Sequence, residues 1–219
     1  MGCIRLAQFL KELAVENFTH IPALLAAGAD RIELNDNLAV GGTTVSRGVM
    51  AEATRYIHEK QRSVAVMIRP RGGDFVYNDT EIKIMEADVF SAQELGADAI
   101  VTGALTPAGD IDTDAMEQLI AAAAGMDVVF HMAFDAIPEE KQATALTWLA
   151  AHDVVRVLTH GGPLTTPITN TLPHLAETIK AAPAGLTILP GGGVTAVNAD
   201  QIAETLHVKQ LHGTKLITI

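Results

Sequence analysis

The feature that most constrains this chain is a recurring junction at which an amphipathic helix ends in glycine and a short apolar strand follows. The segments 27–34 and 95–102 both carry Gly-Ala-Asp at this junction, starting at Gly28 and Gly96. Glycine adopts the left-handed conformation that ends many helices, and a short apolar run is typical of a buried strand. Two copies of the junction indicate a repeated helix–strand unit.

The same alternation runs along the whole chain. Strands are predicted at 11–15, 31–34, 64–69, 99–102, 128–131, 154–159, 186–189 and 208–212, and helices at 17–27, 46–60, 80–95, 112–124, 139–151, 168–182 and 196–205. Alternating strands and helices form a parallel sheet, and eight strands favour closure because an open sheet leaves two unpaired edges.

We therefore predict one α/β domain over residues 1–219, a compact TIM-like (β/α)8 barrel that lacks the last helix. Residues 1–9 are expected to form a separate N-terminal segment, either a helix or a flexible extension. A doubly wound open sheet is the alternative architecture.

Charge and composition restrict the partners of the chain. A formal net charge of -11 repels nucleic-acid phosphates and anionic membrane surfaces. The sequence contains no run of 18 apolar residues, so no membrane span is predicted. The charged residues within 1–13 argue against a signal peptide. The single cysteine, Cys3, cannot form an intramolecular disulfide. We expect a cytoplasmic protein that binds neither nucleic acid nor membrane.

Two arginines and two acids lie near the ends of predicted strands, where barrel active sites are built. Arg69 and Arg71 lie in the run Arg-Pro-Arg-Gly-Gly-Asp-Phe, and guanidinium groups suit recognition of carboxylate or phosphate. Glu33 interrupts an apolar strand, so it acts either as a base or ligand-orienting acid or as the salt-bridge partner of Arg69. Glu16 follows the first strand in the same manner as a candidate ligand contact.

His131 ends the fifth strand and Asp135 follows four residues later. A histidine beside a carboxylate can transfer protons or bind a metal. The alternative is a histidine that is only hydrogen-bonded within the core. The candidate catalytic residues are therefore Glu33, Arg69, His131 and Asp135.

Glycine-rich segments follow the last three strands. Backbone amides freed by glycine can cradle an anion, and the loops after strands seven and eight of barrels often hold phosphate. The alternative is that small residues merely let the barrel top close. The candidate anion-binding residues in these segments are His160, Gly161, Gly162, Gly191, Gly192, Gly193, His212 and Gly213.

Five motifs together resemble the copper homeostasis protein CutC family. They are RIEL at 31–34 with DNLAVGGTT at 36–44, IRPRGGDFVY at 68–77, FHMAFD at 130–135, VLTHGG at 157–162 and PGGG at 190–193. The resemblance covers about residues 10–215. It implies a TIM-like barrel in the cytoplasm, a role in copper homeostasis with Cu(I) as the bound ion, and a homo-oligomer.

The chain departs from this family pattern at two positions. Related members carry cysteines near the ends of the first two strands, where this sequence has Ala14 and Asn35. Cu(I) prefers thiolate and thioether ligands, so both expected thiols are replaced, and the residues themselves assign no metal ligand.

Three functions are compatible with these patterns. The resemblance favours a copper-binding protein without catalysis. The convergence of arginine, glutamate, histidine and glycine-rich loops favours an enzyme, or a former enzyme, that acts on a small phosphorylated or carboxylated metabolite. A purely structural, partner-binding barrel is the third alternative, and the many polar strand ends argue against it.

Overall fold

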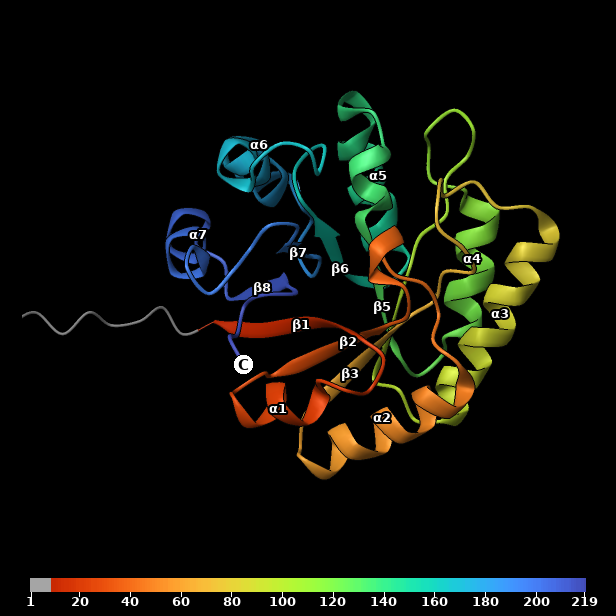
Figure 1. Ribbon diagram of the computed structural model, residues 1–219. Helices are drawn as coiled ribbons and strands as arrows, with labels where there is room; N and C mark the ends of the chain where they lie inside the picture. Colours follow the sequence, from red (N-terminus) through yellow and green to blue (C-terminus); the bar gives the residue numbers. More distant parts are fainter. Residues whose placement is uncertain (1–8) are drawn as a thin grey trace, which may run out of the picture.

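The computed structural model describes residues 9–219 and shows parallel strands surrounded by helices (Figure 1). The predicted N-terminal segment 1–9 therefore lies outside the described residues, apart from Phe9. The strands are β1 (Leu10–Glu16), β2 (Arg31–Asn35), β3 (Ser63–Met67), β4 (Ala99–Thr102), β5 (Asp127–Phe130), β6 (Val154–Thr159), β7 (Thr187–Pro190) and β8 (Gln210–Gly213). The α-helices are α1 (Ile21–Ala26), α2 (Arg47–Glu59), α3 (Asp79–Glu94), α4 (Thr113–Ala122), α5 (Glu139–Ala151), α6 (Ile168–Ala181) and α7 (Ala199–Leu206).

The strands form a nearly closed barrel. Their order is β7-β6-β5-β4-β3-β2-β1-β8, and every hydrogen-bonded pair is parallel. The two end strands, β7 and β8, lie side by side without a ladder between them. No helix follows β8 in the described chain. The predicted barrel without a last helix is confirmed, and the open-sheet alternative is wrong.

The repeated Gly-Ala-Asp junction works as predicted and also ties neighbouring strands together. Gly28 and Gly96 have φ values of 97° and 81°, which are left-handed. The carboxylate of Asp30 accepts from the backbone N–H of Lys11 at 3.0 Å, and that of Asp98 accepts from Val64 at 2.8 Å. Each junction therefore ends a helix and fixes the start of an adjacent strand.

The two faces of the sheet carry different side chains. Val64, Val66 and Ile68 pack in the large core between the strands and the helices. Ala65 and Met67 alternate with them and belong to a separate small apolar cluster with Ala99, Val101 and Val129. Because strand side chains alternate between faces, this second cluster fills the part of the barrel interior formed by β3, β4 and β5.

The first and the last α-helix both begin later than predicted. The helix predicted at 17–27 begins only at Ile21, because Asn17 has a left-handed φ of 61°. The helix predicted at 196–205 begins at Ala199, because the side chain of Asn198 closes a turn by accepting from the backbone of Thr195 at 2.7 Å.

Two 3₁₀ helices, η1 (Leu38–Val40) and η2 (Met132–Ala136), lie in segments for which no helix was predicted. None of the described helices is long and apolar enough to span a bilayer.

Replacing Gly96 by alanine tests the left-handed junction. An added Cβ meets no atom within 4 Å there, so any loss reflects backbone conformation alone, which costs about 1–2 kcal/mol for an L-residue. Urea unfolding measures this loss. Gly48→Ala is the matched control, since Gly48 lies in α2 with equally open space, and alanine should keep or raise stability there. Equal effects of the two substitutions would contradict the assigned role of Gly96.

Candidate functional site

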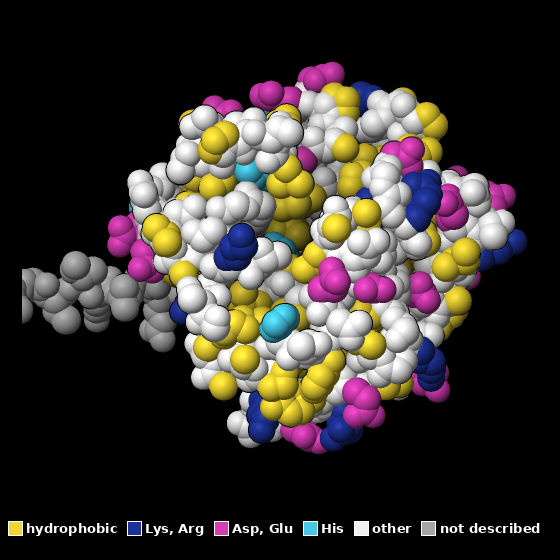
Figure 2. All heavy atoms as spheres, in the orientation of Figure 1, with side chains coloured by type: hydrophobic (Ala, Val, Ile, Leu, Met, Phe, Trp, Pro, Cys, Tyr) yellow, Lys and Arg dark blue, Asp and Glu magenta, His cyan; other side chains and the backbone are white. Residues whose placement is uncertain are grey.

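A cavity of about 490 Å³ opens at the C-terminal ends of the strands. The face seen in Figure 2 is hollowed near its middle, with hydrophobic and histidine side chains in the recess. The predicted site residues that line the cavity are Glu33, Arg69, His131, Asp135, Gly162, Gly192, Gly193, His212 and Gly213. Those that do not line it are Glu16, Arg71, His160, Gly161 and Gly191. The barrel therefore brings together most, but not all, of the predicted site.

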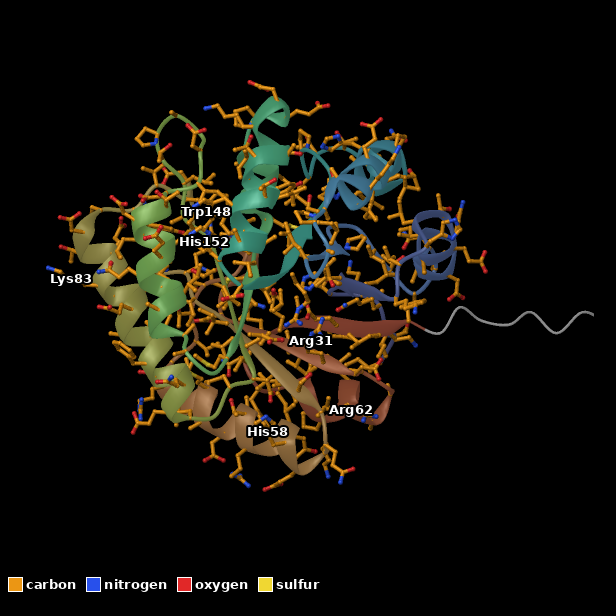
Figure 3. All side chains as sticks on the ribbon, turned by 180° about the vertical axis from the view of Figure 1, so that it is seen from behind. Arg31, His58, Arg62, Lys83, Trp148 and His152 are labelled. Atoms are coloured by element: carbon orange, nitrogen blue, oxygen red, sulfur yellow. The ribbon has the colours of Figure 1, made fainter. Side chains whose placement is uncertain are left out.

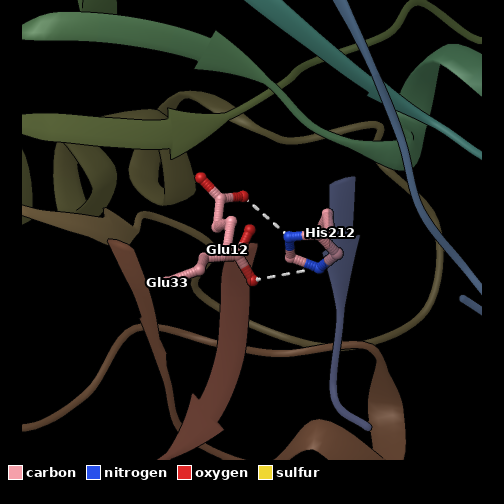
Figure 4. Close-up of side chains that lie close together, drawn as sticks. All are labelled: Glu12, Glu33 and His212. Atoms are coloured by element: carbon pink, nitrogen blue, oxygen red, sulfur yellow. Dashed lines mark hydrogen bonds and ion pairs between the residues drawn. The ribbon is translucent and has the colours of Figure 1, made fainter. Parts of the chain in front are cut away.

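Glu33 belongs to a buried charged cluster on the cavity floor. His212 faces both Glu12 and Glu33 (Figure 4), with its Nδ1 at 2.7 Å from Glu12 Oε1 and its Nε2 at 3.9 Å from Glu33 Oε2. Arg31 pairs with the other oxygen of Glu12 and also donates to Gln210 at 2.8 Å. Seen from behind in Figure 3, Arg31 lies near the middle of the barrel. The cluster thus extends from the barrel interior to the cavity.

Burial and mutual charge shift the pKa values in this cluster. Burial raises the pKa of Glu12, but the hydrogen bond from His212 and the charge of Arg31 outweigh it and lower that pKa to about 2. Burial raises the pKa of Glu33. For His212 burial opposes protonation, yet the two glutamates raise its pKa. The cluster therefore holds an ionised Glu12 beside two groups whose pKa values lie above their ordinary values.

Arg69 is buried and binds backbone carbonyls rather than an acid. Its guanidinium donates to the carbonyl oxygens of Val40 at 2.8 Å, Gly42 at 3.0 Å and Gly73 at 2.9 Å. No ion pair joins it to Glu33 within residues 9–219. The expected alternative of a Glu33–Arg69 salt bridge is therefore wrong, and Arg69 instead locks the loops after β2 and β3 together.

Arg71 and Glu16 lie outside the cavity, which corrects the expectation that they converge on it. Arg71 donates to Glu81 at 2.5 Å and to Asp74 at 3.0 Å, and it holds the pKa of both carboxyl groups below their usual values. Glu16 is exposed and accepts from the backbone N–H of Leu38 at 2.7 Å. Both side chains stabilise loops.

His131 is a buried cap of η2. Its Nδ1 accepts from the backbone N–H of Ala133 at 3.1 Å, and its Nε2 has no partner. Burial and the nearby Arg69 charge lower its pKa to about 3. A neutral imidazole whose Nδ1 accepts a hydrogen bond carries its proton on Nε2. His131 is therefore a neutral N–H donor at neutral pH, and Asp135 is not its partner.

Asp135 lies in η2, and its carboxylate is hydrogen-bonded to the glycine-rich loop after β6. Its carboxylate accepts from Thr159 Oγ1 at 2.6 Å and from the amides of His160, Gly161 and Gly162 at 2.9, 3.0 and 3.2 Å. These amides are thus already bound to the chain's own carboxylate. The expectation that this loop cradles an external anion is wrong, because Asp135 takes that place.

His160 also serves a loop contact. Its ring nitrogens face the carbonyl oxygens of Gly192 at 2.6 Å and Thr166 at 3.0 Å, which ties the loops after β6 and β7 together.

The glycines after β7 and β8 let the barrel top close. A Cβ would lie 2.6 Å from Leu158 at Gly191, 2.6 Å from Leu164 at Gly192 and 2.6 Å from the carbonyl oxygen of Val194 at Gly213. Gly192 and Gly193 also line the cavity, and their amides have no acceptor among residues 9–219. The alternative of close packing therefore holds for three of these glycines, and the amides of Gly192 and Gly193 are the pair left for anion binding.

Glu12 and Arg31 belong to the cluster but were not predicted as site residues. Both are polar residues that interrupt apolar strands, as Glu33 does, and the strand register places Glu12 opposite Arg31 and His212. The alternation of side chains at 12, 14 and 16 and at 31, 33 and 35 could have identified them as a second inward-facing set.

Comparisons with known proteins match nearly the whole described chain and all give the same family. A family model described as the CutC family matches residues 9–217. A family protein CutC from Enterococcus faecalis is 50% identical and covers 95% of this chain and 100% of its own length. The human copper homeostasis protein cutC homolog is 39% identical over 93% of this chain and 72% of its own length. The crystal structure of CutC from Streptococcus agalactiae superposes with a TM-score of 0.93 at 49% identity, covering 95% of this chain and 100% of its own.

Replacing Glu12 by glutamine tests the charged cluster. The lowered pKa of Glu12 adds stability above the unfolded value of 4.5, and this contribution disappears as the pH falls toward 2. Removing the charge also leaves Arg31 unpaired, so we expect a loss of about 3–5 kcal/mol at pH 7. Urea unfolding at pH 7 and pH 3 measures both effects, and the variant should lose less on acidification than the wild type.

Glu94→Gln is the matched control because it removes only an exposed ion pair with Arg47. Its stability should change by less than about 1 kcal/mol. Similar behaviour of the two variants would show that the cluster does not stabilise the barrel.

Proposed function

The chain belongs to the CutC family, and from this premise we propose that it takes part in copper homeostasis by binding the copper ion. The supporting observation is the identity of 39% over 93% of this chain to the human copper homeostasis protein cutC homolog. The proposal includes the cytoplasmic setting and the homo-oligomer that the sequence resemblance implies. Copper is here the ion that the protein handles, not a component of its fold.

The side chains present do not fit a thiolate copper site. The positions at which the resemblance implies cysteines hold Ala14, whose methyl group lines the cavity, and Asn35, which is fully buried. The His/Cys/Asp/Glu group closest to a metal-ligand arrangement in residues 9–219 consists of Glu12, Glu33 and His212. The ligand atoms of this set are mainly carboxylate oxygens, and Glu12 is already paired with Arg31. Cu(I) instead prefers sulfur ligands. We therefore assign no copper ligand.

A Cu(I) titration against a competing chelator tests the copper proposal. The wild type should bind more tightly than an unrelated barrel of similar size, because the proposal requires some affinity. The double variant Ala14→Cys/Asn35→Cys should bind at least about tenfold more tightly still, since it supplies two soft ligands. Wild-type affinity equal to that of the unrelated barrel would remove copper binding from the proposed function.

A second candidate function is the binding of a small anionic molecule, such as a phosphorylated or carboxylated metabolite, in the cavity. The observation that favours it is the pair of free amides at Gly192 and Gly193 on the cavity wall. Amides at consecutive glycines form a concave site for an anion. The buried guanidinium of Arg69 adds a positive charge to the same cavity.

Titration with inorganic phosphate, followed by NMR of the backbone amides, tests this second candidate. The amide signals of Gly192 and Gly193 should shift with saturation. Those of Gly161 and Gly162 serve as internal controls, because they already donate to Asp135. Equal shifts at both pairs, or no shift at either, would contradict an anion site after β7.

A further inference from the structure

The wall that the cavity presents to solvent is largely apolar. Its half-buried or exposed side chains include those of Leu38, Val40, Phe75, Met132 and Leu164, and hydrophobic side chains lie in the recess seen in Figure 2. A cavity of about 490 Å³ has the size of a small-molecule site, and such sites are lined mainly by apolar side chains. The wall therefore suits the apolar part of a ligand rather than a bare ion.

The ionisable side chains of the cavity lie beneath this wall. Glu33, Arg69 and His131 are each only 3% exposed. By contrast, Gly192 is half-buried and Gly193 is exposed, and their amides have no acceptor among residues 9–219. These two amides are therefore accessible hydrogen-bond donors at the edge of the apolar wall, and adjacent backbone donors of this kind bind anions.

The apolar wall and the two amides meet at Gly192. A Cβ built at Gly192 would lie 2.6 Å from Leu164 Cδ2 and 3.0 Å from Met132 Cε, so both side chains lie against the backbone that carries the donors. An anionic group bound to the amides therefore places the rest of its molecule beside Leu164 and Met132. Inorganic phosphate has no such part and leaves these contacts unused.

Leu164 and Val40 remain accessible to solvent although they line the cavity. Leu164 is 63% exposed and Val40 is 42% exposed. The position of Val40 is fixed, because its carbonyl oxygen accepts from Arg69 at 2.8 Å and its side chain lies 2.8 Å from where a Cβ at Gly72 would be. Exposed apolar surface that is concentrated at a cavity is typical of a ligand-binding site, since a ligand that covers it removes it from water.

We propose that the cavity binds an amphipathic anion, a carboxylate or phosphate group attached to an apolar chain or ring. The anionic group accepts from the amides of Gly192 and Gly193, and the apolar part contacts the wall beginning at Leu164. This inference rests on the second candidate function above and adds the apolar part of the ligand. Leu164 is then the side chain that distinguishes such a ligand from an inorganic ion.

Titration with probes of increasing apolar size, followed by NMR of backbone amides and methyl groups, tests this inference. One series runs from acetate through butyrate to hexanoate, and a second compares inorganic phosphate with phenyl phosphate. Each methylene that enters the cavity should tighten binding about fourfold, which corresponds to about 0.8 kcal/mol. Phenyl phosphate should bind at least about tenfold more tightly than inorganic phosphate. The series that binds more tightly identifies the anionic group.

The NMR signals should also separate the two parts of the ligand. Each anionic probe should shift the amide signals of Gly192 and Gly193, whereas only the probes with an apolar part should shift the methyl signals of Leu164 and Met132. Benzyl alcohol has a ring but no charge, so it should bind at least about tenfold more weakly than phenyl phosphate. Equal affinity for these two probes would show that the amides take no part in binding and would overturn the inference.

Leu164→Ser tests the contact at the edge of the wall. It should weaken phenyl phosphate binding about tenfold and inorganic phosphate binding much less, since it removes apolar surface but no backbone donor. Ile84→Ser is the matched control, because Ile84 is 47% exposed on α3 and does not line the cavity. It should leave both affinities unchanged. Both side chains are exposed, so both variants should fold, which urea unfolding checks.

The phosphate and carboxylate series distinguish failure of this inference from failure of anion binding itself. Equal affinity for phenyl phosphate and inorganic phosphate, together with no gain along the carboxylate series, would overturn the inference. If inorganic phosphate still shifts Gly192 and Gly193 in that case, anion binding survives and only the apolar part of the ligand is lost. If no probe shifts these amides, the inference and the second candidate function both fail.

Discussion

The structure depends on a group of charges enclosed by a barrel. Glu12 is 2% exposed and bonds to Arg31 and His212 on the two strands beside it. Isolated charges in such a place would be very unfavourable, but strand register brings opposite charges together. The strand register on either side of β1 therefore also places opposite charges next to one another inside the barrel. A shift of one residue would place these charges against the helices.

The enclosed charges lie on one side of the barrel and reach the cavity through Glu33 and His212. The interior side of β3, β4 and β5 is filled by small apolar residues such as Ala65 and Val101. The interior side of β1, β2 and β8 carries Glu12, Arg31, Glu33 and His212. Apolar packing therefore fills one wall, while the other presents Glu33 and His212 to the cavity.

The sequence predicted the barrel and most residues of the cavity, because alternation and strand ends are local signals. It could not predict what binds the amides of the loop after β6. Asp135 reaches them only because η2 places its carboxylate there. For the same reason Arg71 was misplaced, because its partner Glu81 lies in the first turn of α3. Glu12 was not predicted, although it has the same local signal as Glu33, a charged residue within an apolar strand.

Position 35 determines how the carboxylate of Glu33 is held. Asn35 is fully buried, and its amide nitrogen donates to Oε2 of Glu33 at 2.8 Å and to the backbone carbonyl of Glu33 at 3.1 Å. A cysteine offers only a weak S–H donor there, so it could not fix the carboxylate equally well. The asparagine that removes a soft metal ligand thus orients Glu33 so that one oxygen is bound and the other is left free. Metal binding at this position and an oriented carboxylate require different side chains, and this chain has the one that serves the carboxylate.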